Sequence, residues 1–96
     1  MTLHEEIRRG HEAERLMADP LLSEAFGALD EHILTAMKQC AVADVTTQHE
    51  LVLTLQLMEK LKRHIKTHIQ TGELAKEQKR KASLSERVKG AIQRVM

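Results

Sequence analysis

Aromatic side chains are almost absent from this 96-residue chain, which has one Phe and neither Trp nor Tyr. Aliphatic residues and methionine therefore have to fill its interior. Aromatic and β-branched residues are enriched in strands, whereas Leu, Met and Ala favour helices. Only one Pro and four Gly interrupt the sequence. This composition predicts an all-α fold, and the length allows one domain at most.

The first two predicted helices have clear start signals. Thr2 and Glu5 form a capping box, in which a hydroxyl and a carboxylate satisfy free amides at a helix start, so a helix is expected from about Leu3 to Ala18. Asp19 is a favourable N-cap and Pro20 suits the first helical position, so a second helix begins there. Its apolar residues recur every three or four positions, which predicts one apolar face made of Leu22, Phe26, Leu29, Ile33, Met37 and Cys40.

A third helix is predicted from about Gln48 to Thr71. A second capping box, Thr47 with Glu50, follows a connector over residues 41–46, and Gly72 provides a C-terminal stop. The expected core is an antiparallel hairpin of residues 20–40 and 47–72, with the N-terminal helix packed beside it. Residues 1–75 then form the helical domain.

The first half of the third helix is apolar on more than one side, because Val52, Leu53 and Leu57 spread around the helix axis. A short chain has few elements to cover two faces, so the surface over residues 51–61 is predicted to bind another protein chain. Part of the apolar pattern is explained by packing within the hairpin. Self-association into a four-helix arrangement would cover the rest.

The C-terminal part, residues 76–96, is predicted to be a basic linker followed by an amphipathic helix. Residues 73–81 are polar, and Ser83 with Glu86 forms a third capping box. The last helix has an apolar stripe that is expected to be a second protein-binding element and that includes Val88, Ile92 and Val95.

Charge is unevenly distributed along the chain. Residues 1–40 contain eight acidic and four basic residues, and residues 41–96 contain six acidic and eleven basic residues. The basic residues concentrate near the C-terminus, at Lys76, Lys79, Arg80, Lys81, Arg87, Lys89 and Arg94. Phosphate contacts need little more than positive charge, whereas base stacking needs aromatic residues that this segment lacks. The alternative function is a small regulatory protein that binds nucleic acid, without regard to sequence, or a nucleic-acid enzyme through this segment. A solvated basic tail is the plain interpretation.

No catalytic, metal or cofactor site is predicted. His64 and His68 share one helix face, but no third ligand is fixed by spacing and the pattern lacks the glutamate of a zinc-protease helix. Cys40 ends an apolar stripe and is interpreted as a small buried hydrophobe. The four glycines are isolated, so no phosphate-binding glycine loop is present.

The single cysteine fits a reducing compartment. The charged start of the chain does not look like a secretory signal, and no apolar run approaches the length of a membrane span. A cytoplasmic location is therefore expected, in a host cell or in a virion if the protein is phage-encoded.

Residues 11–75 resemble small helical proteins encoded by tailed bacteriophages and prophages. The similarity lies in Asp19-Pro20-Leu21-Leu22 leading to Phe26, in an acidic loop residue, Asp44, and in Glu50-Leu51 opening a long helix that ends near Gly72. The resemblance implies a non-enzymatic accessory role in a phage particle or in its assembly, and it carries over no catalytic residue. The expected function is thus protein–protein association, with other copies of the chain as the expected partners.

Overall fold

The computed structural model describes residues 1–95, with the side chain of Val95 left undescribed. In this part of the chain three helices follow one another without any strand: α1 (Leu3–Ala18), α2 (Pro20–Gln39) and α3 (Val45–Val95). The predicted all-α fold class is confirmed.

The start signals of α1 and α2 act as the sequence predicts. The Thr2 hydroxyl oxygen accepts a hydrogen bond from the Glu5 amide at 3.2 Å. The Asp19 carboxylate accepts from the amides of Leu21 at 2.8 Å and Leu22 at 3.1 Å. Since an N-cap satisfies amides that have no partner inside the helix, these two residues fix where each helix begins.

The third helix begins earlier than predicted. Asp44, and not Thr47, is the capping residue, because its carboxylate accepts a hydrogen bond from the Thr47 amide at 3.1 Å. The Gln48 side-chain amide donates to the carbonyl oxygens of Ala41 and Val42, at 3.0 Å each, and so fixes the connecting loop. Hydrogen bonding from the side chain and the backbone amide of Thr47 lowers the pKa of the exposed Asp44 carboxyl below its usual value.

The predicted helix stop at Gly72 is wrong, because Gly72 lies inside α3, which is 51 residues long and ends at Val95. A glycine ends a helix when it adopts a positive φ angle, and no glycine does so here. Ser83 and Glu86 lie inside the same helix and cap nothing. The predicted linker and separate last helix are therefore one continuous segment of α3. The division into two domains stays a prediction.

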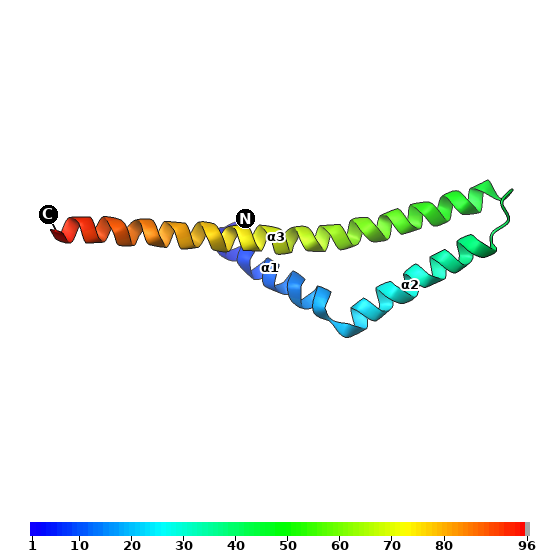
Figure 1. Ribbon diagram of the computed structural model, residues 1–96, viewed down its shortest axis with the longest axis horizontal. Helices are drawn as coiled ribbons and strands as arrows, with labels where there is room; N and C mark the ends of the chain where they lie inside the picture. Colours follow the sequence, from blue (N-terminus) through cyan, green and yellow to red (C-terminus); the bar gives the residue numbers. More distant parts are fainter. Residues whose placement is uncertain (96) are drawn as a thin grey trace.

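The molecule is an elongated, flat triangle with one side extended. Figure 1 shows that α1 and α2 form a V whose open side is closed by α3, so that α1 and α2 follow one another along α3. The chain measures 80 × 25 × 18 Å. Residues 80–95 of α3, here called the overhang, extend past the start of α1 (Figure 1). Over most of its length the rod is therefore no more than two helices thick (Figure 1).

Two glycines meet where α1 crosses α3. A Cβ atom at Gly10 would lie 2.9 Å from the Gly72 Cα and 3.1 Å from the His68 carbonyl oxygen, and a Cβ at Gly72 would lie 3.2 Å from the Glu6 carbonyl oxygen. Ala13 and Ala75, each three residues further along its helix, are buried beside them. Small residues let two helix backbones approach closely, and the two helices are in backbone contact at this crossing.

The packing of α2 on α3 is more open than that of α1 on α3, and the closely packed hairpin of the prediction is not confirmed. Ile33 is the one buried residue of α2. The other contacts involve half-buried side chains: the Lys62 ammonium lies 3.3 Å from an Asp30 carboxylate oxygen and 5.2 Å from the centre of the Phe26 ring. The contact between α2 and α3 thus contains one buried residue of α2 and otherwise half-buried side chains.

The crossing predicts opposite effects of alanine at different glycines. Gly72→Ala places a methyl group against the α1 backbone, and such overpacking costs about 1–3 kcal/mol. Gly27→Ala is the control, because nothing lies within 4 Å of a Cβ there and alanine in a helix interior gains about 1 kcal/mol. Urea unfolding is expected to show Gly27→Ala more stable than the wild type and Gly72→Ala less stable than Gly27→Ala by at least the overpacking cost. Equal stability of the two variants would contradict the close crossing.

Candidate functional site

Three leucines form an uncovered apolar stripe on the first half of α3. Leu53, Leu57 and Leu61 follow one another at intervals of four residues and remain 44%, 63% and 51% exposed. Residues four apart lie on neighbouring turns of one helix face. Leu51, Leu55 and Met58 are half-buried and lie on the side of α3 that α2 covers. The stripe therefore lies beside the α2 contact and is not part of it.

A leucine of α2 joins this stripe. Leu61 and Leu29 immediately precede Lys62 and Asp30, the two residues of the interhelical ion pair. Each step back along a helix turns the side chain by about 100°, and because α2 and α3 run antiparallel, both steps turn toward the same flank. Leu29 is 49% exposed. We call Leu29, Leu53, Leu57 and Leu61 the leucine flank.

The opposite flank of the α2–α3 pair is polar. A groove there is lined by side chains of all three helices: Met17, Leu22, Ser23, Phe26, Gly27, Asp30, Lys62 and Lys66. Burial of Lys62 acts to lower its pKa, but the hydrogen bond and charge of Asp30 and the charge of Glu59 outweigh it, and the net pKa is raised. The two flanks thus differ in chemistry: exposed leucines gather on one, and an ion pair and a second lysine line the groove on the other.

The structure separates the residues that the sequence predicted to bind protein. Leu53 and Leu57 lie together on the leucine flank. Val52 is 38% exposed, and one step back from Leu53 turns it toward the polar side. Val88 and Ile92 lie on the overhang, 56% and 51% exposed, roughly 45 Å along the helix from Leu57. The side chain of Val95 lies outside the described residues. The two apolar stripes therefore do not make one surface.

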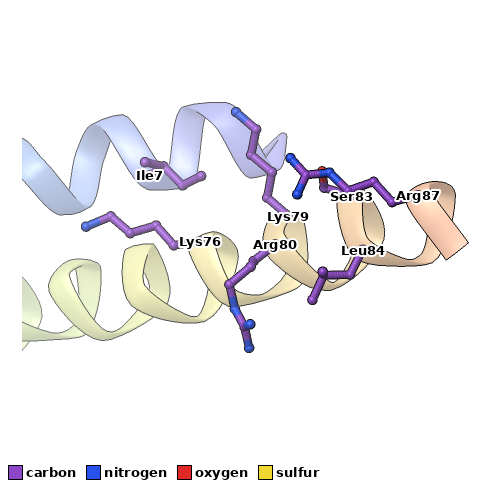
Figure 2. Close-up of a pocket in the computed structure, with 7 residues that line it drawn as sticks. All are labelled: Ile7, Lys76, Lys79, Arg80, Ser83, Leu84 and Arg87. Atoms are coloured by element: carbon purple, nitrogen blue, oxygen red, sulfur yellow. The ribbon is translucent and has the colours of Figure 1, made fainter.

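The basic residues gather where the overhang passes the start of α1. Figure 2 shows an open groove there, lined by Ile7 of α1 and by Lys76, Lys79, Arg80, Ser83, Leu84 and Arg87 of α3. Lys79, Ser83 and Arg87 point to the same side as α1, whereas Arg80 and Leu84 point away (Figure 2). Lys81, Lys89 and Arg94 do not line the groove.

Two of these bases already have partners on the same helix. The Lys76 ammonium lies 3.1 Å from a Glu73 carboxylate oxygen, and the Arg80 guanidinium pairs with Glu77. The hydrogen bond from Arg80 lowers the pKa of Glu77, and the same bond raises the pKa of Arg80. In residues 1–94 the other C-terminal bases have no ion pair: Lys79, Lys81, Arg87, Lys89 and Arg94.

No chemistry-bearing cluster is visible in the described part of the chain. Groups of three or more His, Cys, Asp or Glu residues that fit a metal ion do not occur there. The His64 and His68 rings contact each other edge to face with centroids 5.0 Å apart. The Cys40 thiol is half-buried and lies 3.6 Å from the Ala41 carbonyl oxygen. His64 is exposed, and His68 and Cys40 are half-buried.

Sequence reasoning missed Leu29 as a surface residue and Gly10 as a contact residue. Leu29 belongs to the regular apolar pattern that predicts one buried face on the second helix. Where only two helices pack together, the buried strip of each helix is narrower than that predicted face. For Gly10 a signal exists: Gly10 and Gly72 each lie inside a helical pattern and each is followed three residues later by an alanine.

Comparisons with known proteins found no match: no protein-family model, curated protein or solved structure is similar to this chain. Within residues 1–95, none of the helices is both long enough and apolar enough to cross a membrane.

The Lys62–Asp30 pair predicts a dependence of stability on alkaline pH. A raised pKa in the folded state means that the pair stabilises the fold fully at pH values below the unfolded Lys pKa, and that this contribution disappears as the pH rises through the folded pKa. Lys62→Met should therefore lower the free energy of unfolding at neutral pH, by up to about 1 kcal/mol. Urea unfolding at pH 11 should show a smaller difference from the wild type. A difference that is constant over this pH range would mean that packing, and not charge, explains the loss.

Proposed function

We propose that this chain is a non-enzymatic protein-association element, a phage-type structural or assembly accessory protein, in which a second copy covers the leucine flank. The observation that carries the proposal is the amount of surface that one copy leaves exposed. The exposed surface supports association in general, and the phage-type role rests on the resemblance of residues 11–75.

One copy exposes more surface than a folded domain of its size. Its accessible surface is 7797 Å², whereas a compact protein of 10.9 kDa exposes roughly 5,600 Å². The radius of gyration is 22.3 Å, against about 13 Å for a compact domain of this length. The excess of roughly 2,200 Å² is within the range that each subunit of an obligate dimer buries.

The hydrophobic core of one copy is correspondingly small. The buried apolar residues in the described part of the chain are Ala13, Ile33 and Ala75, and two of these are alanines. Sixteen large hydrophobic side chains remain exposed. Burial of apolar surface is the main stabilising term in folding. When a second pair of helices packs against a two-helix rod with so small a core, the rod buries more apolar surface.

A second copy supplies the missing helices in the simplest way. Two copies that pack leucine flank to leucine flank give a section of four helices, which is a common arrangement of helical pairs. A two-fold axis places the same surface on both sides of the contact, so one apolar flank is sufficient. In this assembly, α2 and the first half of α3 are proposed to close into the antiparallel hairpin that the sequence predicts.

An aspartate on the leucine flank tests the proposal. Leu57→Asp buries a charge at the contact, twice in each dimer, and is expected to weaken self-association at least roughly 100-fold. Leu74→Asp is the matched control, because Leu74 lies on the same helix, is 65% exposed compared with 63% for Leu57, and faces away from α1 and the flank. Sedimentation equilibrium over a range of concentrations measures both. Equal weakening by the two substitutions would contradict the assignment of the contact to this flank.

A third variant separates association from folding. Ile65 is half-buried and lines a groove between α1 and α3 together with Ala13 and Leu16. Ile65→Asp is therefore expected to unfold the chain, with a loss of helical circular dichroism, whereas Leu53→Asp and Leu57→Asp keep their helix content at concentrations where they are monomers. If all three variants lose helix equally, the leucine flank belongs to the folding core.

A further inference from the structure

The bases on the C-terminal part of α3 are not distributed evenly around the helix. Each residue turns the helix by about 100°, and on this basis five of the seven basic side chains fall within one sector of about 100° around the axis. These five are Lys76, Lys79, Arg80, Arg87 and Arg94, here called the basic face. Lys81 and Lys89 lie outside that sector. We propose that the basic face binds the phosphate backbone of nucleic acid without regard to sequence. This proposal goes beyond the proposed association and uses a different surface.

Part of the basic face continues the side of α3 that packs against α1, whereas Arg80 points away from α1 (Figure 2). Gly72, Ala75 and Lys76 lie on that side at the crossing, and Ser83 and Arg87 follow on it in the next turns (Figure 2). Apolar and small residues on α3 are thus followed by bases beyond the first turn of α1. A helix that kept packing against this chain would need an apolar or acidic surface there. The change in chemistry indicates a partner that is anionic.

The shape of the groove favours a phosphate backbone over a membrane. Lys76, Lys79 and Arg87 line a concave region between the start of α1 and the overhang (Figure 2). A convex phosphodiester strand can enter such a region and contact bases on both sides of it. The apolar stripe of the overhang consists of three half-exposed aliphatic residues and has no aromatic residue to anchor it at a lipid interface: Leu84, Val88 and Ile92.

The charge available for binding is large for so short a segment. Residues 76–94 contain seven bases and two acids, Glu77 and Glu86. Lys79, Arg87 and Arg94 have no ion pair within residues 1–94. The acids at the start of α1, Glu5 and Glu6, form no ion pair with them either. The basic face spans roughly 27 Å along the helix, a length that meets several successive phosphates.

Nothing on this face reads bases. The segment has no aromatic residue for stacking, and its long flexible cations contact phosphates as point charges. The affinity is therefore expected to depend steeply on salt and only weakly on sequence.

Two double variants with the same change in net charge test the proposal. Lys79→Gln with Arg87→Gln removes two members of the basic face, and Lys81→Gln with Lys89→Gln removes two bases outside it. The probe is a fluorescent DNA duplex of mixed sequence, and anisotropy gives the dissociation constant at several salt concentrations. Removal of the face pair is expected to weaken binding about 10-fold or more at low salt and to reduce the slope of log K against log salt by about two. The control pair is expected to change the slope by less than about one.

Three outcomes would overturn the proposal. The first is no binding of the duplex by the wild type at low salt. The second is equal weakening by the two double variants, which would reduce the effect to net charge. The third is tight binding to vesicles of anionic lipid in the absence of duplex binding. The solution mass of each variant without DNA is measured in parallel, so a failure of self-association is visible separately from a failure of nucleic-acid binding.

Discussion

The close approach of Gly10 and Gly72 fixes the position of α1 on α3, and the remaining packing follows from it. With hydrogen atoms in place of side chains, the two backbones approach to a distance that no other pair of residues would allow. Ala13 and Ala75 extend the contact on either side. Because small side chains bury little apolar area, this crossing orders the helices without giving the chain a large core.

The length of α3 turns that local contact into an open molecule. α1 and α2 together have fewer residues than α3, so each can cover only part of it and neither covers the overhang. The leucine flank is the apolar surface that remains beside α2, and the basic face is the charged surface that remains beyond α1. Both proposals therefore have one structural origin: a long helix with too few partners in its own chain.

The sequence predicted the local features of the fold more accurately than its long-range ones. Thr2 and Asp19 cap α1 and α2 as expected, because capping depends on neighbouring residues alone. Gly72 was assigned as a helix stop, and the Ser83–Glu86 pair as a new start. Both assignments are wrong. The local signal at Gly72 does not show that this glycine faces another helix, and without a stop at Gly72 the helix continues through Ser83 and Glu86. Leu53 and Leu57 were correctly predicted to be exposed, whereas the contribution of Leu29 required the antiparallel pairing of α2 with α3.

The two surfaces are compatible within one assembly. The leucine flank lies on the first half of α3 and the basic face on its last third, so a dimer formed through the flank leaves both overhangs accessible. Charge separates them as well, since the flank contains no charged residue and the overhang is rich in bases. Salt is therefore expected to affect nucleic-acid binding strongly and self-association little.

The most direct test of the account is the solution mass of the wild-type protein, measured by light scattering at low and at high salt. A mass of at least twice 10.9 kDa is expected at both salt concentrations, because the contact is apolar. A helical monomer at both salt concentrations would contradict this expectation, since the exposed surface would then be stable in water without a second copy.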